Sequence, residues 1–182
     1  MKRKLFQIVG LLVLSLIMGC VGPLVYASGP YRGRVVDAET KSPIEGAVAL
    51  LVWHKYLPVG AHMPRVFVDA VEALTDAKGE FAVPEQTHLV LLGTIDKPAL
   101  LIYFPGYSPY SSTAYKNRLH EVQFRRLKTR EERVRFADLS VYVSNNVPAA
   151  KVPNLIRLLN HERKELGLPP ISSVEQSQLE SP

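Results

Sequence analysis

Two turn-centred stretches, residues 33–48 and 71–84, constrain the fold of this chain most strongly. Each consists of two short apolar runs on either side of residues that favour a tight change of chain direction. In the first, Gly46 permits a positive φ or a close backbone approach as the next strand begins. In the second, Asp76 and Gly79 occupy the first and fourth positions of a type I-like turn. Both stretches therefore predict β-hairpin corners of an antiparallel sheet.

The spacing within these stretches resembles a known family. Residues 33–48 follow the pattern G-x-V-V-D-x-x-T-x-x-P-I-x-G-A-V, residues 75–84 follow T-D-x-x-G-x-F-x-V-P, and Gly106 and Tyr107 come after a further predicted strand. This combination resembles the carboxypeptidase regulatory-like domain, a small transthyretin-like (prealbumin-like) β-sandwich. The resemblance covers residues 33–107, and it implies a folding module without catalytic residues of its own.

The N-terminus has the composition of a bacterial export signal. Basic residues at positions 2–4 precede an apolar stretch at residues 5–18, which is shorter than the ~20 residues that a membrane-spanning helix needs. The only cysteine, Cys20, follows this stretch directly. The ending Ile-Met-Gly-Cys resembles the lipobox, in which the cysteine is lipidated and becomes the mature N-terminus, although leucine is usual in place of Ile17 and a smaller residue in place of Met18.

Three interpretations of this segment stay open. In the first, residues 1–20 are a lipoprotein signal peptide, and acyl chains on Cys20 hold the protein to a membrane by burying methylenes at ~0.8 kcal/mol each. In the second, a signal peptidase cuts after Ala27. In the third, the stretch remains as a transmembrane anchor that extends through Val25. The position of the only cysteine favours the first, and all three place the body on the periplasmic or extracellular side of the cell envelope.

The charge and the cysteine content argue against a nucleic-acid-binding protein and against a fold stabilised by internal disulfides. Without residues 2–4, the 22 basic residues fall to 19 against 17 acidic ones, so the exported chain is close to neutral and nucleic acid is not an expected partner. One cysteine cannot form an internal disulfide, and the fold must depend on its apolar core.

The resemblance implies a β-sandwich, which we place at residues 31–128 after a tether at residues 21–30. The predicted strands are residues 31–36, 47–56, 65–74, 80–83, 99–104 and 119–127. The strand at 47–56 is apolar on both faces, so we expect it to be central and covered on both sides. Residues 88–94 fit either a loop or a strand, and the polar, Tyr-rich residues 108–117 predict a surface loop.

A helical extension is expected at residues 129–168. Thr129 and Glu132 fit a capping box, which predicts a helix that runs to about Tyr142. The alternation of apolar and polar side chains over residues 139–144 also fits a strand, although we favour the helix.

A second helix begins near Pro153 and ends at Gly167. Its apolar stripe recurs at helical spacing and predicts that this helix covers an open sheet face or edge. Residues 169–182 predict a disordered tail.

The sequence contains no recognisable catalytic or metal site. Metallocarboxypeptidases bind zinc through a His-x-x-Glu pair and a distant histidine, but no histidine here has a glutamate three residues on. His54 and His62 are the remaining candidates for a structural metal site, although loop histidines are usually solvated. Ser108 lacks the second glycine of a nucleophile elbow. We therefore predict no enzyme activity, no cofactor and no metal.

Aromatic residues are the most suggestive binding feature. Trp53, Tyr107 and Tyr110 come from segments that we expect to meet at one end of the sandwich, where exposed aromatics stack on sugars or anchor a protein partner. The alternative, which we favour, is that Trp53 and Tyr103 lie in the core while Tyr107 and Tyr110 pack over the loop beneath them.

The expected function is that of a non-catalytic module, anchored to the envelope membrane, for binding or structural support at the cell surface or in the periplasm. One alternative is a small-molecule carrier or enzyme whose site lies between the sandwich and the helices and uses His88 or His120. Another is an assembly subunit of an envelope complex that accepts a partner strand at an open sheet edge. A filled interface between sandwich and helices favours the module, and an apolar pocket containing a histidine favours the carrier or enzyme.

Overall fold

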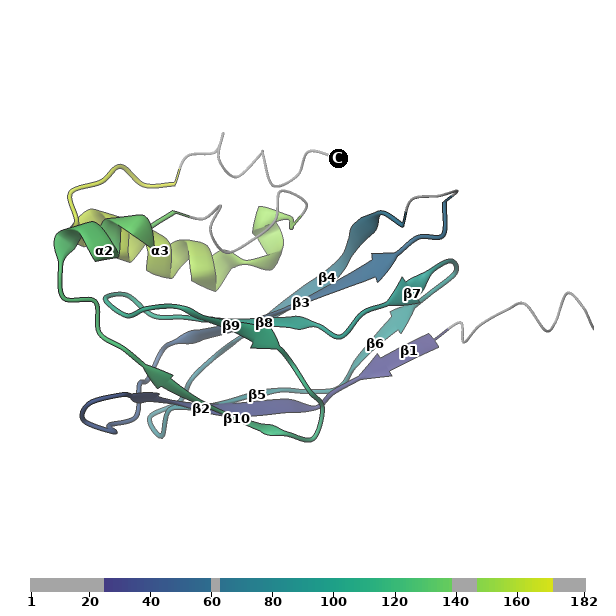
Figure 1. The fold of residues 1–182 in the computed structure, drawn as a ribbon, viewed down its shortest axis with the longest axis horizontal. Coiled ribbons are helices and arrows are strands. Elements are labelled where there is room, and N and C mark those ends of the chain that lie inside the picture. Colours follow the sequence, from purple (N-terminus) through teal and green to yellow (C-terminus); the bar gives the residue numbers. More distant parts are fainter. Residues whose placement is uncertain (1–24, 60–62, 139–146, 172–182) are drawn as a thin grey trace, which may run out of the picture.

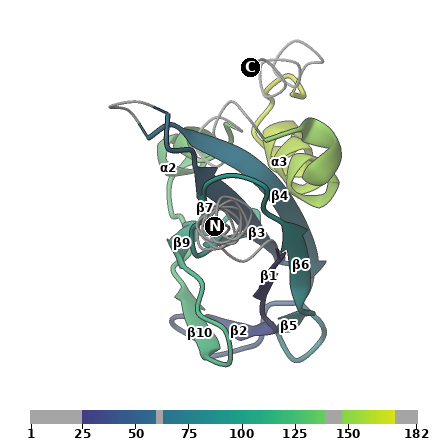
Figure 2. The same cartoon turned by 90° about the vertical axis from the view of Figure 1, so that its right-hand side faces the viewer.

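The computed structural model describes residues 25–59, 63–138 and 147–171. The strands are β1 (Val25–Ser28), β2 (Tyr31–Asp37), β3 (Val48–Tyr56), β4 (Arg65–Leu74), β5 (Glu80–Val83), β6 (Gln86–Leu89), β7 (Thr94–Ile95), β8 (Ala99–Tyr103), β9 (Tyr110–Thr113) and β10 (Leu119–Phe124). The helical segments are α2 (Arg130–Arg135), the 3-10 turn η2 (Ala149–Lys151) and α3 (Pro153–Glu165). Two sheets face each other and the helices cover the outer face of one, so the body has three layers (Figures 1 and 2).

The strand pairing confirms the predicted fold class, a mainly β protein whose antiparallel sheets form a sandwich with a C-terminal helical extension. One sheet has the order β4-β3-β8-β9, with β7 paired to the end of β3, and the other has the order β10-β2-β5. Strands β1 and β6 form a separate antiparallel pair. The pairing of β2 with β10 is parallel, whereas the other strand pairs are antiparallel.

Strand β3 is central and covered on both faces, as its sequence predicts. Ala49, Leu51 and Trp53 point into the core between the two sheets. Val48, Leu50 and Val52 point to the opposite face, into a second core beneath the helices. Because side chains alternate between the faces of a strand, this one strand contributes to both cores.

Helix α3 covers the outer face of the β3 sheet through the predicted apolar stripe. Leu155, Leu158 and Leu159 are buried in the second core. The start of the helix is fixed from the sheet, because the Glu72 carboxylate on β4 accepts the backbone N–H groups of residues 154 and 155, each at 2.8 Å. A carboxylate at this position also complements the positive end of the helix dipole. Gly167, with a φ of +69°, follows the helix as expected.

The second helical segment, α2, is shorter than predicted. The capping box of Thr129 and Glu132 is present, but the helix ends at Arg135 rather than near Tyr142. None of the residues Arg130–Arg135 is buried, so packing against the sheet does not stabilise this helix. Residues 139–146, where a helix and a strand were the alternatives, lie outside the described residues.

Two segments predicted as irregular form strands. The tether contains β1, and Tyr26 of this strand packs against the core. Strand β1 pairs with β6, so residues 88 and 89, for which a loop and a strand were both open, belong to a strand. The predicted surface loop at 108–117 contains β9, which pairs with β8. These short strands were missed because they are polar or alternate weakly, and backbone pairing with a neighbour determines their structure. In the predicted tail, Ile171 is buried, and residues 172–182 lie outside the described part of the chain.

We predict that Leu159→Ala lowers the free energy of unfolding by about 2–5 kcal/mol, because it leaves a cavity beneath α3. The matched control is Arg157→Ala, two residues away on the exposed face, which should change the free energy by less than about 0.5 kcal/mol. Urea denaturation of the detergent-solubilised protein measures both. Equal values for the two variants would mean that α3 does not pack on the sheet in solution.

Candidate functional site

The three buried histidines in the described part of the chain each have different surroundings. His88 on β6 lies in the core, 5.1 Å from the ring of Trp53 between centroids, while His54 on β3 packs edge-on against Phe67. His120 on β10 accepts the backbone N–H of residue 115 through Nε2 at 3.2 Å. Burial lowers the pKa of all three imidazoles, which keeps them neutral near pH 7. His62 lies outside the described residues, and within them no cluster of three or more His, Cys, Asp or Glu side chains is placed to hold a metal ion.

The predicted ligand-contacting aromatics do not form one exposed surface. Trp53 has 0% of its surface exposed, and its indole N–H donates to the Ser28 hydroxyl in the core at 3.1 Å. Tyr107 is also buried, and Tyr110 on β9 is partly buried against the same core. Cys20 lies outside the described residues.

Tyr107 belongs to a polar cluster that joins three segments of the chain. Its hydroxyl donates to Asp37 Oδ2 at 2.9 Å, and Arg126 Nε donates to the same oxygen at 2.7 Å. Asp37 Oδ1 accepts the backbone N–H groups of Glu39 and Thr40 at 2.8 and 2.9 Å. These bonds hold the pKa of Asp37 well below its usual range, with the Thr40 N–H as the largest cause and Arg126 the next. Both oxygens of this carboxylate accept hydrogen bonds from within the protein, so the cluster serves to hold the three segments together.

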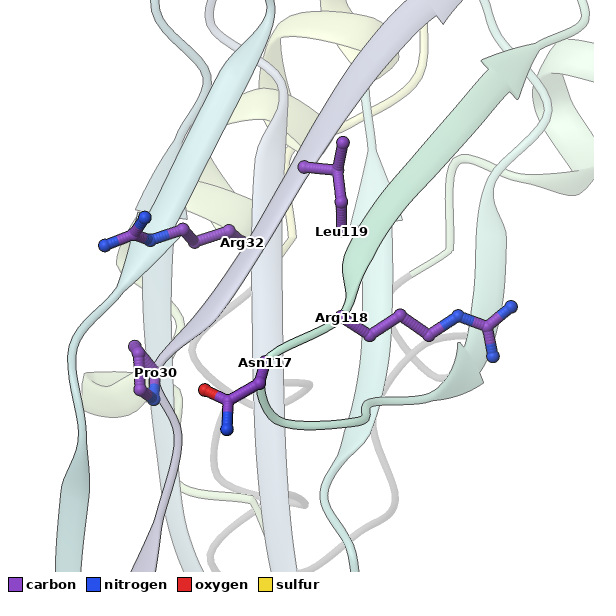
Figure 3. Close-up of a pocket in the computed structure, with 5 residues that line it drawn as sticks. All are labelled: Pro30, Arg32, Asn117, Arg118 and Leu119. Atoms are coloured by element: carbon purple, nitrogen blue, oxygen red, sulfur yellow. The ribbon is translucent and has the colours of Figure 1, made fainter.

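A shallow pocket of about 420 Å³ lies where β2 and β10 begin. It is lined by Pro30, Arg32, Asn117, Arg118 and Leu119 (Figure 3). Figure 3 shows the side chains of Arg32 and Arg118 extending away from each other, so the two guanidinium groups do not converge on one anion. The pocket therefore lacks the geometry of a phosphate or carboxylate clamp.

A second hollow, of about 520 Å³, lies between the end of β8 and α3, and it contains His161. Its buried acid, Glu162, is held by Arg133 through two hydrogen bonds of 2.7 and 2.9 Å. That carboxylate is committed to joining α2 to α3, and His161 itself is exposed. The hollow is thus a groove at the rim of the helix layer, while the interface beneath the helix is filled.

The most distinctive surface is an apolar end of the sandwich. Six of the nine large exposed hydrophobic residues in the described part of the chain belong to segments at this end: Val25, Val59, Met63, Leu89, Leu91 and Leu92. Val25 and Leu89 are directly opposite each other in the β1–β6 pair, and Gly93 lies against the backbone of Tyr56 at the end of β3. Figures 1 and 2 show the start of β1 and the connections β3–β4 and β6–β7 at the same end of the molecule. We call these six residues the apolar end, and it is the candidate binding site.

Comparison with known proteins finds distant structural likeness. No protein-family model matches the chain, and no curated protein matches it. Two point mutants of the shaft pilin SpaA from Lactobacillus rhamnosus GG align at 17% identity with a TM-score of 0.33, over 55% and 56% of this chain and 47% and 48% of theirs. The C-terminal domain of that pilin aligns at 15% identity with a TM-score of 0.32, over 58% of this chain and 100% of its own. This chain spans about half the length of the first two pilin chains, and the likeness assigns no function.

We predict that Asp37→Asn destabilises the protein at neutral pH and weakens its acid sensitivity. A carboxylate with a lowered pKa stabilises the folded state above its unfolded pKa of about 3.9, and that contribution is lost as the pH falls toward the folded value. Free energies of unfolding at about pH 7 and about pH 3 should therefore differ less in the variant than in the wild type.

Tyr107→Phe is the matched control, because it removes one hydrogen bond to Asp37 and no charge. It should cost about 0.5–1.5 kcal/mol and leave most of the pH dependence in place. An unchanged pH dependence in Asp37→Asn would show that this carboxylate does not have a lowered pKa.

Proposed function

We propose that this protein is a non-catalytic β-sandwich module of the carboxypeptidase regulatory-like type, held to the bacterial cell envelope by a lipid on Cys20. Its role is to bind or support a protein or carbohydrate partner at the cell surface or in the periplasm. The observation that carries the proposal is the filled interior: β3 is covered on both faces, and the interface between sheet and helices is occupied by apolar side chains. A carrier or enzyme of the alternative kind needs an open pocket there.

The positions of the histidines also favour a module over that alternative. His88 contacts Trp53 in the core between the sheets, and His120 lies on β10, in the sheet remote from the helices. Neither imidazole belongs to the core beneath α3. A catalytic histidine has to reach its substrate from a pocket, and these two side chains serve the packing of the sandwich instead.

The position of β1 supports lipidation at Cys20 over cleavage after Ala27. Cleavage there removes three of the four residues of β1, including Tyr26, which packs against the core. Cleavage before Cys20 leaves the whole strand in place. No helix in the described part of the chain has the length and apolar character of a membrane span.

We predict that Cys20→Ala abolishes a lipid-sized mass increment and releases the protein from the membrane fraction. The intact mass of the protein and its distribution between membrane and soluble fractions measure the two effects. The matched control is Ala27→Val, which blocks the small-residue cleavage site but leaves Cys20 intact, and it should behave as the wild type does. An unchanged mass and distribution in Cys20→Ala, or accumulation of a longer chain in Ala27→Val, would contradict the lipid anchor.

A further inference from the structure

The apolar end lies beside the point where the N-terminal segment joins the sandwich. Val25, the first described residue, opens β1 and is itself part of this end. Leu91 and Leu92, in the connection from β6 to β7, have 76% and 57% of their surfaces exposed. Several exposed leucines and valines gathered at one end are unusual on a protein surface that faces only water.

Chain length limits how far the apolar end can lie from the membrane. Four residues separate Cys20 from Val25. Five Cα–Cα steps of 3.8 Å span at most about 19 Å, so an acyl chain on Cys20 holds Val25 within that distance of the bilayer surface. A retained transmembrane anchor that extends through Val25 brings the same end still closer. In both cases this end of the sandwich lies near the membrane.

The residues just behind the apolar end suit the lipid headgroup region. Tyr26 and Tyr56 are partly buried on β1 and at the end of β3, and such amphipathic rings are favoured at the membrane–water boundary. Lys55 and Arg65 lie on the paired ends of β3 and β4, and their cationic groups complement anionic headgroups. The apolar end thus has leucines at its tip, with tyrosines and basic residues behind them. A bilayer changes in the same order, from acyl chains to the interface and the charged headgroups.

The opposite end of the sandwich is polar. Its connections, residues 38–47 between β2 and β3 and residues 75–79 between β4 and β5, carry exposed charged side chains such as Glu39, Lys41 and Lys78. The contrast between the two ends is therefore along the long axis of the molecule (Figure 1).

We infer that the apolar end rests on the lipid bilayer and inserts Leu91 and Leu92 into its interface, so that the sandwich stands upright with its polar end pointing away from the membrane. This inference rests on the proposed envelope anchor. It assigns the apolar end a lipid partner, in place of a second copy of the chain or a protein partner.

The experiment uses added tryptophans as depth probes in the full-length protein, reconstituted into vesicles with brominated acyl chains. The only native tryptophan, Trp53, is fully buried and supplies a constant background. Leu91→Trp places a probe in the apolar end. Leu74→Trp is the matched control, because Leu74 is an exposed leucine at the opposite end of β4. Recovery of each protein with floated vesicles is measured in the same samples.

The expected result is bromine quenching of the added fluorescence in Leu91→Trp and none in Leu74→Trp. A second pair of variants extends the test. The added fluorescence of Leu92→Trp should be quenched. In the double variant Leu91→Asp with Leu92→Trp, this quenching should be weaker, while recovery with vesicles stays the same.

Equal quenching at positions 91 and 74 would overturn the upright orientation. Floated protein with no quenching at position 91 would overturn the lipid contact alone and leave the anchor standing. A blue-shifted but unquenched probe at position 91 would mean that protein, such as a second copy of the chain, covers this end, which also overturns the inference. Loss of recovery with vesicles would contradict the proposed anchor as well as the lipid contact.

Discussion

The structure depends on the burial of both faces of β3. A strand exposed to water on one side needs polar residues at every second position, whereas β3 has apolar residues at six consecutive positions, 48–53. Such a strand is stable only if a layer lies on each side of it, and the chain supplies the β10-β2-β5 sheet on one side and α3 on the other. The C-terminal helix is therefore an integral part of the fold, since without it Val48, Leu50 and Val52 would face water.

Hydrogen bonds and ion pairs fix the positions of the layers relative to one another, which apolar packing alone does not determine. Glu72 on β4 holds the start of α3, and Arg133 with Glu162 joins α2 to α3. Asp37 similarly joins the end of β2 to Arg126 beyond β10 and to Tyr107 beyond β8. Hydrophobic contact is non-directional, whereas these charge-assisted bonds require one geometry. These bonds therefore fix the relative positions of the layers that the apolar cores hold together.

The sequence predicted those elements whose own residues carry a strong pattern. The central position of β3, the turn residues around Gly46 and Gly79, and the capping box of Thr129 are all local features, and the structure contains them. Strands β1 and β9 were missed because each has only four residues and is defined by pairing with another strand, β6 for β1 and β8 for β9. Strands β1 and β6 are far apart in the chain, and no local pattern reports such long-range pairing. Strand β9 follows β8 after a short connection, but its sequence Tyr-Ser-Ser-Thr lacks the apolar alternation of a half-buried strand. The length of α2 was overestimated for a related reason, because the helix buries none of its own residues.

The sequence did not predict the candidate site, because segments far apart in the chain come together to form it. Its apolar residues come from β1, from β6 and from two connections that are separated in sequence, and each residue alone looks like an ordinary apolar position. Only the β1–β6 pairing, which places Val25 opposite Leu89, and the contact of Gly93 with Tyr56 bring them to one end. The aromatic residues that did stand out in the sequence are needed inside, where Trp53 and Tyr107 fill the core. The strand that was taken for part of a tether therefore belongs to the body, because pairing with β6 fixes its first residue, Val25, at the apolar end.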